Sequence, residues 1–459
     1  MAEIFKQKNA WLKYDEAGKK SVMDFCEGYR KFISDNKTER ECAASIIEKA
    51  KKKGYKDLTK VKSVKAGDKL FFNKFDKAVA LFIIGKKPLA HGMKILGAHI
   101  DSPRIDLKQN PLYEDSEMAL FDTHYYGGIK KYQWVTLPMA IHGVICKKDG
   151  TVVKVNIGDK PGDPVVGITD ILIHLGSKQL EKSGAKVVEG EDLNVTVGSI
   201  PLDDEEKSAV KRNVLEILEK NYGLTERDFI SCELEVVPAG EARDFGLDSS
   251  MIMGYGQDDR VCAYTSAEAI FEAKAGDRTQ VCLLVDKEEI GSVGATGMHS
   301  RFFEDCVAEI LDKMGEYKEI DVRRAMSNSV MLSSDVSAAY DPNYSDVFEK
   351  KNTAFFGYGS VLNKYTGARG KSGSNDASPE YIAKLRAAFD KNDVTFQTAE
   401  LGRVDAGGGG TIAYIMGNYG MNVIDSGVAV LNMHAPWEIT SKIDIYETYR
   451  SYKVFLKEL

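Results

Sequence analysis

The chain has 459 residues, about three times a typical domain length of roughly 150 residues, so two or three domains are expected. Hydrophobic residues make up 43% of the chain and charged residues 29%, with no long block of like charge and no heptad repeat, which excludes a disordered chain, a collagen and a coiled coil. The 62 Lys and Arg against 69 Asp and Glu give a net charge of −7, which argues against a nucleic-acid partner.

Neither a membrane span nor a secretion signal is predicted. The longest dense apolar run, residues 78–85, is far shorter than the roughly 18 residues that cross a bilayer. The segment Met1–Lys6 lacks the charged and then apolar pattern of a signal peptide. The seven cysteines are widely spaced with no Cys-x-x-Cys pair, which favours free thiols over disulfides or a thiolate zinc site. We therefore expect a soluble cytoplasmic protein without membrane or nucleic-acid partners.

The first hundred residues are predicted to form helices and then buried strands. Residues 11–52 are expected to be helical, because apolar side chains recur there at helical spacing, at Val22, Phe25, Cys26, Tyr29 and Phe32. Strands are expected at 69–72, 78–84 and 93–96. The last two are apolar runs, typical of strands that are buried on both faces.

The sequence pattern changes near residue 106 and changes back near residue 246. Between these points, three segments alternate apolar and polar residues, as two-faced strands of an antiparallel unit do, at 152–157, 193–198 and 232–237. One helix is expected within this region, over 168–175. Afterwards the α/β pattern resumes, with a helix around 263–271 and strands at 281–285, 329–332, 423–425 and 428–432. We therefore predict a discontinuous α/β domain, residues 1–105 and 246–459, with a domain inserted over residues 106–245.

Four of the predicted strands run directly into residue types that bind metals, and one more candidate stands at the start of a helix. In chain order, the candidates are His99 and Asp101 after the strand at 93–96, Asp258 before the helix, Glu288 and Glu289 after 281–285, Asp335 after 329–332, and His434 after 428–432. Because ligands collect at the carboxyl ends of strands in α/β sheets, we expect these side chains to meet at one sheet edge.

Each candidate alone also has an ordinary structural explanation. His99 or His434 could be a buried histidine with a local partner, and Asp258 could be a helix N-cap. Asp335 could close a turn, and the two glutamates could be solvated surface charge. It is not expected by chance that all of these side chains lie at one sheet edge. A set of carboxylates and imidazoles is suited to binding Zn²⁺, Co²⁺ or Mn²⁺.

The chemistry of two divalent ions accounts for these residue types. Ions about 3.5–4 Å apart need a bridging carboxylate and further ligands for each ion. One carboxylate must stay off the metals to take a proton from the water that they activate. Adjacent glutamates can fill both roles, because neighbouring side chains diverge. In His-x-Asp, Asp101 can accept the second ring N–H of His99 and fix its tautomer.

With these residues assembled, the sequence resembles the aminopeptidase I / aspartyl aminopeptidase family of dinuclear zinc exopeptidases. The matching motifs run in family order across nearly the whole chain and are Gly97-Ala-His-Ile-Asp-Ser-Pro103, Gln257-Asp-Asp-Arg260, Asp286-Lys-Glu-Glu-Ile-Gly-Ser292, Ser334-Asp335 followed by Pro342-Asn-Tyr344, and Met433-His434. This ordered set is specific, whereas any single motif is not. The resemblance implies an α/β, zinc-peptidase-like catalytic domain with a central mixed sheet flanked by helices, and an inserted, mostly-β dimerisation domain.

The resemblance also implies a role for each candidate. His99 and Asp335 match the ligands of one metal, Glu289 and His434 those of the other, Asp258 the bridging carboxylate, and Glu288 the general base. The implied cofactors are two divalent ions, zinc with cobalt or manganese as alternatives. Which terminal ligand serves which ion stays open.

For the inserted domain, the resemblance implies dimers that assemble into a tetrahedral shell of twelve subunits. A family histidine in an Ile-His-Leu segment reaches a neighbouring subunit's active site and stabilises the oxyanion. His174 matches it, with a histidine satisfied locally within a helix as the alternative. Members that prefer acidic N-terminal residues carry His before Pro-Asn-Tyr, where this chain has Asp341, so acidic and neutral N-terminal residues both stay open.

The predicted function is a metallo-aminopeptidase that removes N-terminal residues from peptides, with Glu288 as general base. The alternative is a related dinuclear amidohydrolase, a deacylase or carboxypeptidase. A deacylase or carboxypeptidase needs a cationic side chain that binds the carboxylate of the substrate. An aminopeptidase instead needs acidic side chains around the free amine of the substrate. A third possibility is an inactive scaffold that assembles through the insertion. Glu288 argues against it, because an inactive enzyme has no use for a base beside two cations.

Overall fold

The computed structural model describes residues 7–203 and 207–459, and the chain divides into two compact units. The first unit runs to Asp101 and takes in Ala242–Met433 and Glu438–Leu459. The second unit comprises Ser102–Glu241 and His434–Trp437. The boundaries predicted from the sequence, after residues 105 and 245, each lie four residues further along the chain than those of the structure.

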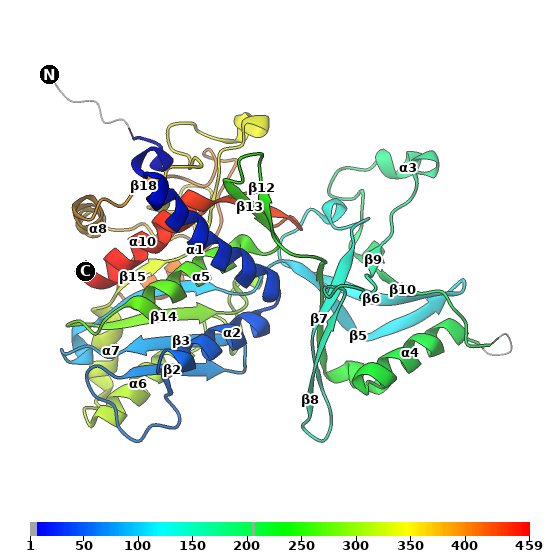
Figure 1. Ribbon diagram of the computed structural model, residues 1–459, viewed down its shortest axis with the longest axis horizontal. Coiled ribbons are helices and arrows are strands. Elements are labelled where there is room, and N and C mark those ends of the chain that lie inside the picture. Colours follow the sequence, from blue (N-terminus) through cyan, green and yellow to red (C-terminus); the bar gives the residue numbers. More distant parts are fainter. Residues whose placement is uncertain (1–6, 204–206) are drawn as a thin grey trace. The chain divides into compact units, whose positions relative to one another are not determined.

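The first unit is built on a nine-stranded mixed sheet (Figure 1). In their order across the sheet, the strands are β1 (Lys56–Asp57), β2 (Lys69–Lys74), β3 (Ala78–Ile83), β14 (Thr279–Val285), β4 (Met93–His99), β15 (Val330–Ser333), β19 (Asn422–Gly427), β17 (Ser360–Asn363) and β18 (Phe396–Thr398). Strands β14, β4, β15 and β19 run parallel to one another, and β3 and β17 flank this group in the antiparallel direction. The predicted strands of the α/β region up to residue 425 are confirmed.

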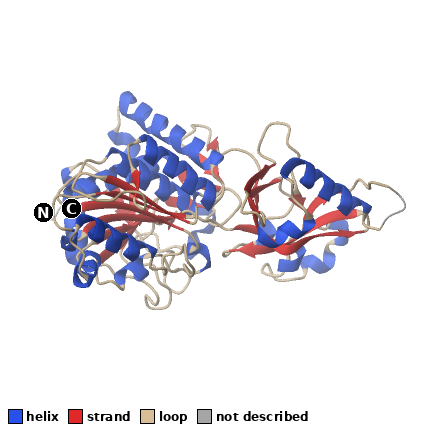
Figure 2. Cartoon of the chain, turned by 90° about the horizontal axis from the view of Figure 1, so that it is seen from below, coloured by secondary structure: helices blue, strands red, loops and turns tan. Residues whose placement is uncertain are grey.

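Helices cover both faces of this sheet (Figure 2). One apolar core contains side chains of α1 (Glu16–Asp35), α2 (Glu39–Lys52), α5 (Gln257–Glu272), α8 (Pro379–Lys391) and α10 (Lys442–Glu458). The other contains side chains of α6 (Phe302–Met314), α7 (Glu319–Ser327) and α9 (Ala413–Gly417).

Strand β3 contributes alternate residues to the two cores, as a strand buried on both faces must. Leu81 belongs to the first core and Phe82 to the second. Every residue of β3, β4 and β14 is buried. This confirms the prediction, made from their apolar runs, that β3 and β4 are buried on both faces. Burial of each large apolar side chain contributes about 1.5–3 kcal/mol. The ends of these central strands are therefore held firmly from both sides.

The predicted N-terminal helix is interrupted twice, first between the 3₁₀ helix η1 (Ala10–Lys13) and α1, and again between α1 and α2. Helix α1 ends at Asp35 and α2 begins at Glu39. The hydroxyl of Thr38 accepts the backbone N–H of Glu41, whose carboxylate accepts the N–H of Thr38. This capping box starts a new helix, which is why the apolar stripe continues while the helix does not.

A five-stranded sheet also belongs to the first unit, and it corrects one prediction. Its strands are β12 (Arg243–Phe245), β13 (Met251–Gly254), β21 (Glu438–Ser441), β20 (Ala429–Leu431) and β16 (Ser337–Ala338). The strand predicted at 428–432 is β20, which pairs with β21 and β16 and not with the central sheet. The expectation that all four ligand-bearing strands end at one sheet edge is therefore wrong for this strand.

The second unit is a seven-stranded antiparallel sheet with helix α4 (Ala209–Tyr222) and the short α3 (Ser177–Leu180). In order across the sheet, the strands are β8 (Val152–Ile157), β7 (Met139–Cys146), β11 (Cys232–Pro238), β5 (Arg104–Asp115), β6 (Met118–Tyr126), β10 (Val195–Gly198) and β9 (Gly167–Ile168). The three two-faced strands predicted in this region are β8, β10 and β11.

The helix predicted over 168–175 is wrong. Residues 167–168 form β9, and only Ile173–Leu175 make a single 3₁₀ turn, η4. Ile171, Leu172, Ile173 and Leu175 are 47%, 53%, 69% and 69% exposed, so this chain offers no core against which the stripe could pack. Amphipathic helices are stable mainly through such packing.

The architecture is thus the predicted α/β fold, a helix-flanked mixed sheet with a β-rich insertion. No helix among the described residues is long and apolar enough to cross a membrane.

Candidate metal centre

Three neighbouring parallel strands carry most of the candidate ligands to one place. Strand β4 lies between β14 and β15, with His99 paired to Val285 and Gly97 paired to Ser333. His99 is the last residue of β4, and Asp335 follows β15 by two residues. Glu288 and Glu289 begin the 3₁₀ turn η7 (Glu288–Ile290) after β14. The carboxyl ends of three adjacent strands therefore place a histidine and three carboxylates at one sheet edge.

Asp258 reaches the same edge from the start of α5. The helical backbone angles are interrupted at Asp258 and Asp259, and the N-cap position of α5 is Gly256. Asp258 therefore lies at an interruption in the first turn of α5. The backbone N–H of Asp258 donates to the carboxylate of Glu438. The carboxylate of Asp258 itself is directed at His99.

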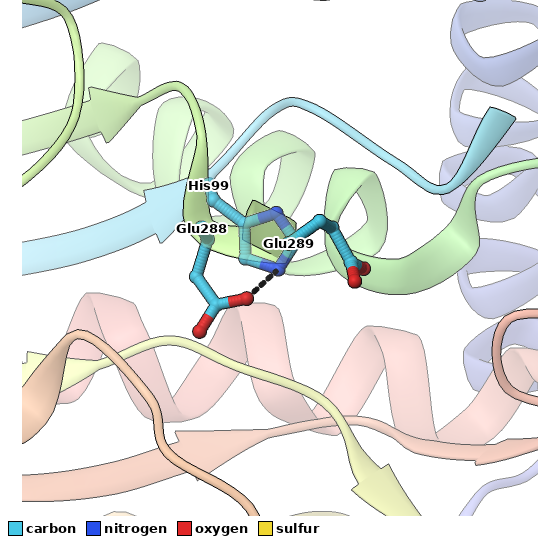
Figure 3. Close-up of side chains that lie close together, drawn as sticks. All are labelled: His99, Glu288 and Glu289. Carbon is cyan, nitrogen blue, oxygen red and sulfur yellow. Dashed lines mark ion pairs between the residues drawn. The ribbon is translucent and has the colours of Figure 1, made fainter. Parts of the chain in front are cut away.

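His99 is the centre of the cluster and is only 2% exposed. Its Nε2 lies 3.2 Å from Oδ1 of Asp258 and 3.9 Å from Oε2 of Glu288. Its Nδ1 lies 3.3 Å from Oδ1 of Asp101 and 3.1 Å from the Asp101 backbone oxygen. Figure 3 shows the side chains of Glu288 and Glu289 diverging from their adjacent positions, with the Glu288 carboxylate directed at the ring.

Asp101 makes contacts that the sequence did not predict. Its Oδ1 accepts the backbone N–H of Glu288 and its Oδ2 that of Glu289, both at 3.2 Å. The same carboxylate faces Nδ1 of His99. Asp101 thus connects the end of β4 to the glutamate turn after β14 and orients the imidazole at the same time.

Two overlapping sets of donor atoms could each hold a metal ion. His99, Asp258 and Asp335 offer atoms that lie within 4.8 Å of one another, and so do His99, Glu288 and Glu289. Two donors on one tetrahedral zinc ion, each about 2.0–2.2 Å away, are about 3.4 Å apart. The 3.2 Å between His99 and Asp258 matches that spacing. The donor set, imidazole and carboxylate without thiolate, is one that Zn²⁺ accepts.

The electrostatics of the cluster also fit a cation. Burial, reinforced by the carboxylates of Glu288 and Asp258, raises the pKa of Asp335 well above its usual value. Burial would by itself lower the pKa of His99, but its hydrogen bonds to Asp101 and Asp258 outweigh burial and raise this pKa well above normal. Neighbouring carboxylates outweigh burial at His99 and add to the effect of burial at Asp335, so the cluster holds an excess of buried carboxyl groups. Divalent cations would neutralise that excess.

Asp259, Asp286 and Asp425 are buried carboxylates near this edge that sequence reasoning left out. Asp259 accepts the backbone N–H of His99 at 3.3 Å, and burial followed by the charge of Asp335 raises its pKa well above normal. Asp286 accepts the Thr296 hydroxyl at 2.6 Å, and burial raises its pKa to about 6.

Asp425 lies on β19, the neighbour of β15, and pairs with Ser333 across the two strands. It accepts the Thr411 hydroxyl at 2.8 Å, and burial raises its pKa to about 6. Asp425 lies within β19 (Asn422–Gly427) and does not follow it, so the strand-end rule that found Asp335 does not find Asp425.

His174 and His434 belong to the second unit. His174 lies in the exposed turn η4. His434 has a positive φ of 65°, and its Nδ1 is 2.7 Å from the backbone oxygen of Gly128. The roles that the resemblance implies for both residues stay predictions.

The chain is similar to known proteins over nearly its whole length. The family described as aminopeptidase I zinc metalloprotease (M18) matches residues 32–456. A probable M18 family aminopeptidase 1 from Clostridium acetobutylicum is 61% identical over 454 residues, which cover 98% of each chain. The crystal structure of an M18 family aminopeptidase from Thermotoga maritima, 43% identical, has a TM-score of 0.96 and covers 99% of this chain and 100% of that chain. The structure of the S. cerevisiae mApe1 dodecamer, 21% identical, has a TM-score of 0.77 over 95% of this chain and 96% of that one.

Gly427 lets β19 approach the Asp335 backbone closely, and this contact is testable. A Cβ at residue 427 would lie 1.9 Å from the backbone oxygen of Asp335 and 3.0 Å from Sγ of Cys262. Gly427→Ala must therefore shift Asp335, and we expect metal content and kcat/KM to fall at least about tenfold. Metal analysis and steady-state kinetics measure both. Gly184→Ala, where a Cβ meets nothing within 4 Å, is the control. Wild-type metal content in Gly427→Ala would show that the position of Asp335 is not critical.

Proposed function

The chain belongs to the aminopeptidase I (M18) family of zinc metalloproteases and is a metallo-aminopeptidase, and from this premise we propose that its centre holds two divalent ions with Glu288 as general base. In this proposal His99 and Asp335 would hold one ion, Glu289 and His434 would hold the other, and Asp258 would bind both. The observation that carries this proposal is the donor set of His99, Asp258 and Asp335, with the carboxylate of Glu288 beside it, 3.9 Å from Nε2 of His99. Zinc is the proposed metal for both sites.

Two such ions supply Lewis acidity at a scissile carbonyl and make water nucleophilic near neutral pH. The side chain of Glu288 is 16% exposed and lies beside His99, where it can take a proton from the attacking water. It can then return that proton to the leaving amine. Asp101 holds the Glu288 backbone and the His99 ring in a fixed relation, so neither has to reorganise during the reaction.

The charge around the centre supports N-terminal peptide cleavage over the alternative chemistry. A deacylase or carboxypeptidase requires a cation for the carboxylate of its substrate. The side chains that the structure places around His99 are the carboxylates of Asp101, Asp258 and Glu288. Asp101 and Glu288 are not proposed metal ligands, so their negative charge adds to that of the ligands and favours a protonated N-terminal amine over a free carboxylate.

We also propose that the enzyme assembles through its inserted domain, as dimers that build a tetrahedral dodecamer. The exposed apolar run at 171–175 supports a covered surface there, because large apolar patches on a soluble chain mark interaction sites. The yeast relative of the same fold is described as a dodecamer. His174 lies within this run, and we propose that it reaches the active site of a neighbouring subunit. We place the enzyme in the cytoplasm, because the seven cysteines are free thiols.

Glu288→Gln tests the general base. The amide keeps the shape of the side chain but cannot take a proton, so we expect kcat to fall by about 10²–10⁴ with metal content unchanged. Glu289→Gln is the matched control, because the neighbouring glutamate is a proposed ligand and its loss should release metal. Hydrolysis of acidic and neutral aminoacyl-anilides, compared with N-acylated amino acids, measures activity and distinguishes the alternative enzyme class. Activity of Glu288→Gln within tenfold of wild type would remove Glu288 from this role.

Asp258→Asn tests the bridge between the two ions. A bridging carboxylate binds both metals, so its loss should release both together, from two ions per chain to fewer than one. Elemental analysis of the purified protein gives this ratio. Asp259→Asn is the comparison variant, because Asp259 belongs to neither donor set and should keep both ions. Loss of a single ion from Asp258→Asn would make Asp258 a terminal ligand.

His174→Ala tests the contribution of the inserted domain to catalysis. We expect kcat to fall about tenfold or more with metal content intact, because an oxyanion donor is removed. His124→Ala, another exposed histidine of the second unit, should leave kcat unchanged. Light scattering checks the assembly, since twelve chains of 50.8 kDa give about 610 kDa. A clean monomer of full activity would contradict both the assembly and the role of His174.

A further inference from the structure

One row of residues crosses three neighbouring strands of the central sheet just before the metal centre. Gly97 of β4 pairs with Ser333 of β15, and Ser333 pairs with Asp425 of β19. His99 follows Gly97 by two residues, and Asp335 follows Ser333 by two residues. Because residues i and i+2 of a strand face the same way, the row lies on the face of the sheet from which His99 projects. An element that spans this row therefore constrains the strand ends that carry two proposed ligands.

The residues Thr411–Tyr414, which we call the bracing segment, span the row. The hydroxyl of Thr411 donates to Oδ1 of Asp425 at 2.8 Å. Ile412 is 1% exposed, and its Cδ1 lies 3.5 Å from the position that a Cβ on Gly97 would take. Neighbouring strands are about 4.8 Å apart, so Asp425 and Gly97 are about 10 Å from each other. Two adjacent residues of the bracing segment thus contact both ends of the row.

The bracing segment also reaches the glutamate loop, residues 287–299, which carries the two glutamates after β14. The hydroxyl of Tyr414 lies 3.1 Å from Nε2 of His299. The backbone N–H of His299 donates to the oxygen of Ser292 at 3.1 Å, and the N–H of Ser292 donates to the oxygen of Lys287 at 2.6 Å. These bonds link His299 to the residue that precedes the proposed base. The bracing segment therefore joins β19, β4 and the glutamate loop.

Asp425 is the anchor of the bracing segment. It is 2% exposed, and a carboxyl group buried within a strand costs stability unless it is hydrogen-bonded. The hydroxyl of Thr411 supplies such a bond, and its oxygen also accepts the backbone N–H of Ala413 at 3.3 Å. The four preceding residues, Gly407–Gly410, bring no side chains that could hold the chain as it enters the segment. The contact between Asp425 and Thr411 therefore sets where the bracing segment begins.

We propose that Asp425 is a positioning residue of the metal centre. Through Thr411 it holds the bracing segment across the row and against the glutamate loop, and so fixes His99, Asp335 and Glu288 relative to one another. A misplacement of about 1 Å can cost a reaction about a hundredfold in rate, so a small shift of the segment suffices to slow the reaction. This proposal rests on the proposed function, because His99 and Asp335 are proposed ligands and Glu288 is the proposed base.

Thr411→Val tests the hydrogen bond, because valine keeps the shape of threonine and lacks its hydroxyl. We expect kcat for leucyl-leucine amide, a dipeptide with a free N-terminus, to fall at least about tenfold. KM should stay within about twofold of wild type, because the geometry of the centre acts in the transition state. The visible spectrum of the cobalt-loaded enzyme should change, since it reports the arrangement of the ligands around Co²⁺. Thr411→Ser keeps the hydroxyl and should restore both kcat and the spectrum.

Thr59→Val is the matched control. The hydroxyl of Thr59 donates to Oδ1 of Asp57 at 2.7 Å, beside β1 at the edge of the sheet, and Thr59 is exposed. This variant therefore loses the same kind of hydrogen bond away from the row. Its kcat, KM and cobalt spectrum should match those of the wild type. Thermal unfolding of both valine variants separates a loss of stability from a change at the centre, because only Thr411→Val should alter the cobalt spectrum.

Each outcome decides one of the two proposals. A wild-type kcat and cobalt spectrum in Thr411→Val would overturn the positioning role, and so would an equal loss of kcat in Thr411→Ser. If Thr411→Val does not fold, Tyr414→Phe decides, because it releases the bracing segment from His299 at a half-buried position. An unchanged kcat in Tyr414→Phe would then overturn the positioning role. Failure of the wild type to bind cobalt or to hydrolyse leucyl-leucine amide would instead count against the proposed function.

Discussion

The carboxylate of Asp101 is the contact on which the geometry of the centre depends. It faces Nδ1 of His99 and accepts the backbone N–H groups of Glu288 and Glu289. These residues come from segments almost two hundred positions apart in the chain. With both oxygens engaged, Asp101 cannot turn without releasing either the imidazole or the glutamate turn. A proposed metal ligand and the proposed base are therefore positioned relative to each other by one buried side chain, before any ion binds.

The same region concentrates negative charge that the rest of the fold must support. Asp259 and Asp335 are buried with Asp258 close by, and burial raises the pKa of the first two. Like charges held together in a region of low polarity oppose folding. The central strands offset this, because β3, β4 and β14 are buried on both faces between two apolar cores. Bound cations would add to stability by binding the folded chain and not the unfolded one.

Local patterns predicted the elements, and long-range pairing decided what the predictions missed. The apolar runs before His99 and Asp335 identified β4 and β15, because a strand buried on both faces leaves that signature in sequence. The partners of a strand leave no such signature. The apolar run before His434 therefore looked the same as the others, although β20 pairs within a different sheet. The backbone contacts of Asp101 and the close approach of Gly427 to Asp335 likewise exist only once the strands have come together.

The helix predicted over residues 168–175 is absent from the structure, and the exposure of these residues supports the proposed assembly. Residues 168–175 carry an apolar stripe dense enough to indicate a packed helix, yet Ile173 and Leu175 are each 69% exposed. A chain that folded alone would gain nothing from large apolar side chains on an exposed turn, and they would make it prone to aggregate. If another subunit covers them, the spacing of these residues follows the shape of that subunit and not the period of a helix. An apolar stripe predicts a helix only if the stripe packs within the same chain. A surface that contacts a second copy does not meet that condition, so the helix prediction fails there. This failure supports the proposal that the inserted domain makes the contacts between subunits and that His174 lies among them.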